Sequence, residues 1–193
     1  RTDRTRYLGA SAALILTEPL FAQFTEIKLV KPFDKNLQKK KAALKAAKDG
    51  FEKLLKYEVG DVTSASTYYI AELYFNFNRA LVESERPDDL SALELEQYEL
   101  AIEEQAYPFE EKAIQIHEKN LEYLSLGIYS SWIETSLTKL AKLIPARYAK
   151  FEESSGYITA IDNTSYVALT NPTPVLVKAD PVPAPVQPLP VPE

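Results

Sequence analysis

Histidine and cysteine, the side chains most often used in catalysis and metal binding, are almost absent from this chain. His117 is the only histidine among 193 residues, and there is no cysteine. A Ser-His-Asp triad would therefore depend on His117, which stands beside Glu118 in a segment with helical periodicity. We interpret His117 as a solvated or partly packed surface histidine, and the sequence favours no nucleophilic catalysis.

Paired acidic residues occur at three places: Glu103-Glu104, Glu110-Glu111 and Glu152-Glu153. A carboxylate-bridged metal site in a helical bundle needs two Glu-x-x-His elements, and one histidine cannot supply both. Adjacent acids also point to different parts of a helix surface. The five glycines are scattered, so there is no glycine-rich phosphate loop. The sequence predicts a protein that is not an enzyme and that has no metal site and no other cofactor.

Charge is unevenly distributed along the chain, whose net charge is −6. Ten lysines and three acidic residues lie between Lys28 and Lys56, whereas sixteen acidic and four basic residues lie between Glu58 and Glu122. Such segments can attract each other within the fold or attract a partner. The lysines from Lys35 to Lys56 surround an ordinary apolar stripe, which argues against nucleic acid as a partner. An anionic membrane surface or an acidic protein is the alternative partner of this segment.

Apolar residues recur at spacings of three and four, which predicts an all-α fold of antiparallel helical hairpins. The expected helices span residues 4–30, 34–57, 64–85, 91–126 and 128–144. Pro19 and Pro108 fall inside expected helices and should kink or divide them. Asp34 is the expected N-cap of the second helix. Ser91 and Glu94 have the spacing of a capping box.

The character of the chain changes after residue 150, which predicts three parts. Residues 1–150 form the expected helical domain, and residues 151–170 a non-helical arm. Residues 171–193 contain eight prolines, which favours an extended proline-rich tail with polyproline II structure. Because the chain begins with Arg1, we expect a processing point or the start of a fragment. The apolar face bearing Leu8, Ile15 and Phe24 would then lack its neighbour.

The third expected helix is rich in aromatic residues, which cover more than one of its faces. Some of them can line a concave peptide groove, while others fill the core between helices. The candidates for contact with a partner are aromatic: Tyr68, Tyr69, Tyr74 and Phe77.

The same helix and the next carry the pattern of a degenerate repeat of about 34 residues. The residues expected to pack within this repeat are mostly small or apolar: Ile70, Ala71, Ala106, Phe109 and Ala113. Small residues let two helices approach closely, and the aromatic residue fills the groove between them. An insertion of residues 79–105 interrupts the pattern. An ordinary helical bundle is the alternative interpretation.

Five stretches together resemble the C-terminal region of large tetratricopeptide-repeat (TPR) proteins of the Gram-negative cell envelope: Arg6–Ser11, Ala80–Pro87, Leu95–Tyr98, Glu103–Ile114 and Pro145–Lys150. The resemblance implies a TPR-like solenoid, in the periplasm or associated with the outer membrane, with further repeats upstream. It implies a non-enzymatic scaffold that binds other proteins of an envelope complex, within a larger chain or assembly. The alternative is a structural subunit whose tail orders against a neighbour. The resemblance carries over no catalytic residues.

Overall fold

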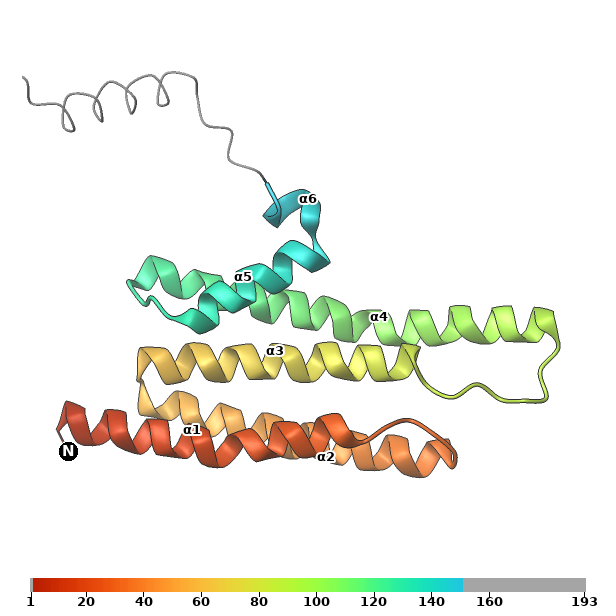
Figure 1. Ribbon diagram of the computed structural model, residues 1–193, viewed down its shortest axis with the longest axis horizontal. Coiled ribbons are helices and arrows are strands. Elements are labelled where there is room, and N and C mark those ends of the chain that lie inside the picture. The colour runs from red at the N-terminus through yellow and green to blue at the C-terminus, as the bar shows by residue number, and fades with distance from the viewer. Residues whose placement is uncertain (1, 151–193) are drawn as a thin grey trace, which may run out of the picture. The chain divides into compact units, whose positions relative to one another are not determined.

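The computed structural model describes residues 2–150, and every regular element in this part of the chain is a helix (Figure 1). The predicted all-α fold is confirmed for these residues. The expected arm at 151–170 and the proline-rich tail at 171–193 lie outside the described residues.

The helices follow one another as antiparallel hairpins. Their bounds are α1 (Asp3–Glu26), α2 (Phe33–Leu54), α3 (Gly60–Val82), α4 (Ala92–Glu122), α5 (Ser131–Leu143) and α6 (Pro145–Tyr148). Short 3₁₀ segments, η1 (Leu55–Tyr57) and η2 (Tyr123–Leu126), follow α2 and α4. The central helix is α3, because it packs against α1, α2, α4 and α5. The main hydrophobic core lies among α1, α2 and α3, and includes Phe24, Phe51 and Leu73.

Neither proline divides its helix, so of the two predicted outcomes, a kink or a division, the division is wrong. The α1 helix continues through Pro19 and α4 through Pro108. A proline removes one backbone donor, which leaves the carbonyl four residues earlier without its helical partner. Those carbonyls belong to Ile15 and Glu104, on exposed sides of their helices, where water can hydrate them.

The helix ends differ from the predicted ones where the cap was misassigned. Pro32, not Asp34, occupies the N-cap position of α2, and no side chain caps this helix. Asp34 lies in the first turn, where its negative charge still interacts favourably with the helix dipole. The capping box at the start of α4 is confirmed, because the Ser91 amide donates to Glu94 Oε2 at 2.9 Å and the Glu94 amide donates to Ser91 Oγ at 3.4 Å.

The predicted insertion at residues 79–105 forms the end of α3, the following loop and the first half of α4. This half of α4 extends past the end of α3 (Figure 1). The loop is tied to the connection before α2 by the Lys31–Asp88 ion pair and by the Lys31 amide, which donates to Glu85 Oε2 at 2.7 Å. Among the ion pairs of residues 2–150, Lys31–Asp88 is the one that joins the basic and acidic segments.

Candidate functional site

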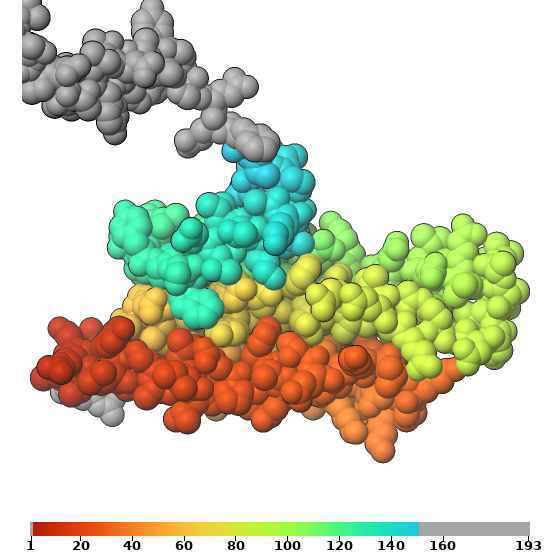
Figure 2. All heavy atoms as spheres, in the orientation of Figure 1, coloured from red at the N-terminus to blue at the C-terminus, as the bar shows by residue number. Residues whose placement is uncertain are grey.

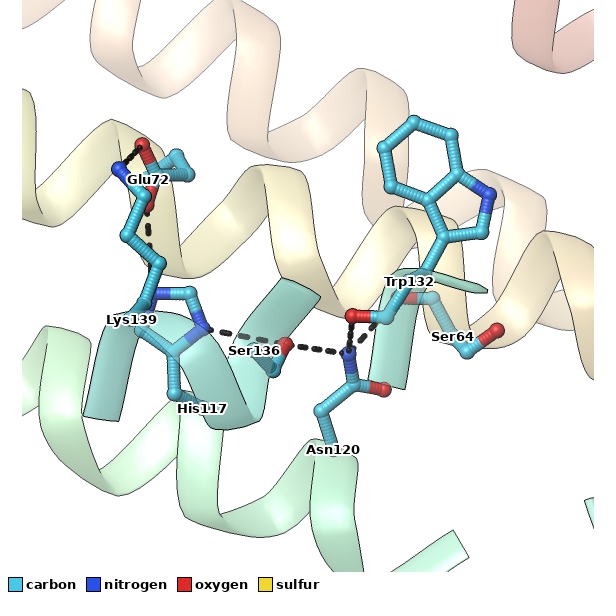
Figure 3. Close-up of polar contacts among 7 residues, drawn as sticks. All are labelled: Ser64, Glu72, His117, Asn120, Trp132, Ser136 and Lys139. Carbon is cyan, nitrogen blue, oxygen red and sulfur yellow. Dashed lines mark hydrogen bonds and ion pairs between the residues drawn. The ribbon is translucent and has the colours of Figure 1, made fainter. Parts of the chain in front are cut away.

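Three helices meet at a buried polar network whose central residue is His117 on α4 (Figure 3). The imidazole Nδ1 shares a hydrogen bond of 3.2 Å with Ser136 Oγ on α5. Its Nε2 lies 3.4 Å from Glu72 Oε1 on α3. Both His117 and Ser136 are fully buried. The three residues therefore connect α3, α4 and α5 through their side chains.

Two further residues extend this network at either end. Asn120 Nδ2 donates to Ser136 Oγ at 2.8 Å and to the Ser64 carbonyl at 3.2 Å. At the other end, Lys139 Nζ donates to Glu72 Oε2 at 2.9 Å. Because a buried polar group without a partner is costly, these contacts fix the position of α5 against α3 and α4.

The buried position of His117 contradicts our interpretation of it as a surface residue. On α4 the buried residues recur at helical spacing: Ile102, Ala106, Ala113, His117 and Asn120. His117 and Asn120 thus continue the inner stripe that the small residues begin. The signal was present in the spacing, but a histidine on such a stripe does not reveal that Glu72 and Ser136 will be its partners.

The electrostatics of the network favour an ionised Glu72. Burial by itself raises the pKa of the Glu72 carboxyl, but the nearby His117 imidazole and the hydrogen-bonded Lys139 outweigh burial and lower the pKa below its usual value. Burial, with the nearby Glu72 charge, raises the pKa of the Tyr68 hydroxyl to about 12. The network thus holds the Glu72 carboxylate beside the side-chain nitrogens of His117 and Lys139 and the neutral hydroxyl of Tyr68.

Glu72, His117 and Ser136 form a chain of acid, histidine and serine, which is the set of groups in a hydrolytic triad. Their burial prevents this use, since the Ser136 hydroxyl is fully covered and already accepts from Asn120. A substrate carbonyl must approach a serine nucleophile directly. We therefore assign the network to packing of the helices.

Aromatic rings form a second cluster around α3, next to the polar network. The Trp132 ring on α5 lies 5.4 Å from the Tyr68 ring and 5.3 Å from the Tyr69 ring, between centroids. Tyr69 also stacks on Phe51 of α2 at 4.8 Å, and its hydroxyl donates to Glu18 of α1 at 3.1 Å. Tyr68, Tyr69 and Trp132 are half-buried, so part of each residue remains accessible to solvent. We call these three residues the aromatic cluster.

The four aromatic residues predicted to contact a partner do not share one surface. Tyr74 lines a different cavity, of about 340 Å³, between α2, α3 and α4. Phe77 lies in the core, where its ring centroid is 4.6 Å from that of Phe109. The structure thus leaves Tyr68 and Tyr69 together, removes Phe77 from the surface, and adds Trp132 of α5.

The residues predicted to pack within a repeat all lie in the interior or at its edge. The buried members are Ile70, Ala71, Ala106 and Ala113. Phe109 is partly buried against the core. The Ala106 carbonyl also accepts from Asn78 Nδ2 at 3.0 Å, which ties α4 to α3 near the C-terminal end of α3.

One lysine of the segment from Lys35 to Lys56 lies inside the protein. Lys40 Nζ donates to the carbonyls of Phe24 and Ile27 at 3.2 and 2.8 Å, and so satisfies the end of α1. Burial, with a smaller effect of Arg79, lowers the pKa of Lys40 to about 8. Lys40 is therefore unavailable to a membrane, and contact through the other lysines of α2 stays a prediction.

No protein-family model, curated protein or solved structure matches this chain. Within residues 2–150, no helix has both the length and the apolar composition needed to cross a membrane. The same residues contain no group of three or more histidine and carboxylate side chains placed to hold a metal ion.

Proposed function

We propose that this chain is a non-enzymatic helical-repeat scaffold that binds another protein through the aromatic cluster. The observation that carries this proposal is that Tyr68, Tyr69 and Trp132 stay partly exposed on helices that a buried network holds in place. Tyr and Trp are the side chains most enriched among residues that dominate binding energy at protein interfaces. Because the helices that carry them are held rigidly, such residues lose less conformational entropy when a partner binds.

The helix contacts support a TPR-like arrangement. In a helical solenoid, each hairpin contacts its neighbours in the series. Here α1 contacts α3, and α3 contacts α5, while α2 and α4 pair with the helices that follow them. The first half of α4 departs from a standard repeat because it extends beyond α3. The proposal is therefore a degenerate TPR-like solenoid.

The chemistry of the cluster favours an extended peptide with an apolar anchor residue as the part of the partner that binds. Ring faces of Tyr68 and Trp132 supply apolar contact, while the Glu18 carboxylate and the Lys139 ammonium lie close to the rings or the network. These charged groups can bind backbone or polar side chains at the edge of an apolar contact.

We place this scaffold in a complex of the Gram-negative envelope, in the periplasm or at the outer membrane. This setting depends on the resemblance of the five stretches to envelope TPR proteins. The alternative is a structural subunit of a larger assembly. The exposed apolar side chains on α1, Leu8, Ile15 and Leu16, favour this alternative. Fractionation of the source cell with an antibody against the chain tests the setting, and a purely cytoplasmic signal would contradict it.

Binding through the cluster can be tested directly because Trp132 is the only tryptophan. Peptides are selected from a random phage-displayed library on the full chain and titrated while Trp132 fluorescence is recorded. We expect saturable changes in emission, and we expect Tyr68→Ala to weaken binding about tenfold, or about 1.4 kcal/mol. Tyr129→Ala is the matched control, since Tyr129 is 81% exposed and lies outside the cluster.

Circular dichroism must first show that Tyr68→Ala keeps its helices. The proposal fails if selected peptides leave Trp132 fluorescence unchanged and bind the Tyr68→Ala and Tyr129→Ala variants equally well. Such peptides would place recognition elsewhere on the helical surface.

A further inference from the structure

The outer side of α1 is an exposed apolar stripe. Leu8, Ile15 and Leu16 are 55%, 65% and 79% exposed. Smaller apolar residues continue the stripe at helical spacing: Ala12, Pro19 and Ala22. Between Tyr7 and Thr25 the one charged residue is Glu18, which turns away from the stripe to Tyr69. In the space-filling view, α1 forms an outer edge of the helical unit (Figure 2).

The opposite side of α1 is apolar as well. Ala10, Leu14 and Phe24 are buried against the core, which corrects our assignment of Phe24 to the uncovered face. A surface helix of a globular protein normally has a polar outer face, whereas a helix that is apolar all round is one that is buried all round. Contiguous exposed apolar surface of this kind marks an interaction site.

The charges at the two ends of the stripe indicate what covers it. Arg4 lies at one end and Glu26 at the other, and Ile15 is eleven residues from each. Both are exposed, and neither takes part in an ion pair among residues 2–150. Glu26 also lies in the last turn of α1, where a negative charge opposes the helix dipole. The stripe therefore has an unpaired positive charge, Arg4, at one end and an unpaired negative charge, Glu26, at the other, among residues 2–150.

We propose that α1 packs antiparallel against α1 of a second copy, with Ile15 at the two-fold axis. This pairing places Arg4 of each copy opposite Glu26 of the other and buries both stripes. The same patch serves on both copies, as a two-fold symmetric interface requires. Parallel pairing would set Arg4 against Arg4 and Glu26 against Glu26. The small residues Ala12 and Ala22 let the two helices approach closely.

The dimer is expected to be weak. From Arg4 to Glu26 the helix rises about 33 Å, and one helix pair of this length buries less than the roughly 1,600 Å² of a standard interface. A dissociation constant of about 1 to 100 µM is the range in which such an interface operates. The dimer is independent of peptide binding, because the stripe contains no residue of the aromatic cluster.

Sedimentation velocity of the full chain, from about 1 µM to about 1 mM, tests the proposal. We expect a monomer that becomes a dimer over this range. Ile15→Glu should abolish the dimer because it places two carboxylates at the axis. Leu126→Glu is the matched control, since Leu126 is equally apolar and 72% exposed in η2, away from α1. Circular dichroism should show unchanged helicity in both variants, because both residues are exposed.

Charge exchange tests the antiparallel direction. Arg4→Glu and Glu26→Arg should each weaken the dimer about tenfold, and the double variant should restore it, because it re-forms both pairs in reverse. A monomer at about 1 mM would overturn the proposal, as would a dimer that Ile15→Glu leaves intact. Equal association of wild type and both single charge variants would overturn the antiparallel arrangement. A partner protein on α1, with no self-association, would also contradict the proposal.

Discussion

Buried polar side chains determine how the helices of this protein fit together. Lys40 joins α2 to the end of α1, and His117 joins α4 to α3 and α5. Each replaces an apolar residue that the helical spacing would otherwise place there. Such residues contribute little stability on average, but removal of one partner leaves the other unsatisfied in the interior.

Among single residues, Glu72 shows how the buried polar network contributes to stability. Its folded-state pKa is below its usual value, so the unfolded chain binds more protons in acid and the ionised carboxylate stabilises the fold. The contribution of Glu72 to stability is therefore present above its unfolded pKa, near 4.5, and is lost as the pH falls through the lower folded pKa. The groups that face the carboxylate are His117, Lys139 and Tyr68.

We expect Glu72→Gln to lower the free energy of unfolding at pH 7 by about 3 kcal/mol, because it leaves two nitrogen groups without a buried carboxylate. The variant should also lose this part of the wild type's acid sensitivity below pH 4.5. Urea denaturation between pH 7 and pH 3 measures both effects. Glu134→Gln, an exposed change on α5, is the control. Equal urea midpoints for wild type and Glu72→Gln would show that the network contributes nothing.

At the scale of elements, the contact between two helices depends on how closely their backbones approach. Gly50 on α2 faces α1 so closely that an added Cβ would lie 3.0 Å from Leu20 Cδ1 and 3.1 Å from Thr17 Cγ2. Gly9, on α1, has room, because its nearest neighbour would be Tyr57 Cε1 at 3.8 Å. The same residue type thus has a packing role in α2 and only a propensity cost in α1.

This difference predicts opposite results for one substitution. Gly9→Ala should raise the free energy of unfolding by about 0.5 to 1 kcal/mol, because alanine favours the helix and meets an ordinary contact. Gly50→Ala should give no gain, since Leu20 and Thr17 must move to admit the methyl group. Urea denaturation at low protein concentration separates these effects from self-association. A larger gain at Gly50 than at Gly9 would contradict the close approach of α1 and α2.

At the scale of the described unit, residues 2–150, the helices differ in how many neighbours cover them. The central α3 helix contacts α1, α2, α4 and α5, whereas the first turns of α4 extend past α3. Local stability follows the density of buried contacts. We therefore expect native-state hydrogen exchange to be slowest for amides of α3 and fastest among helical amides at residues 92–101. More protection in those turns of α4 than in α3 would contradict this order.

The sequence alone predicted the class of the fold and much of its local structure. Apolar spacing indicated five long helices, and the structure has helices at all five positions. Ser91 and Glu94 form the predicted capping box, and Gly127 ends the helical run with a positive φ of 76°. These features depend on residues within a few positions of one another, so a single segment contains the information.

Tertiary structure decided the burial of Lys40 and His117, the separation of Tyr74 from Tyr68 and Tyr69, and the uninterrupted helices at both prolines. Helical spacing shows which residues share a face, but it does not show which neighbour covers that face. A lysine becomes an interior residue only because the end of α1 offers it carbonyls. His117 is buried because α3 and α5, distant in sequence, bring Glu72 and Ser136 to it.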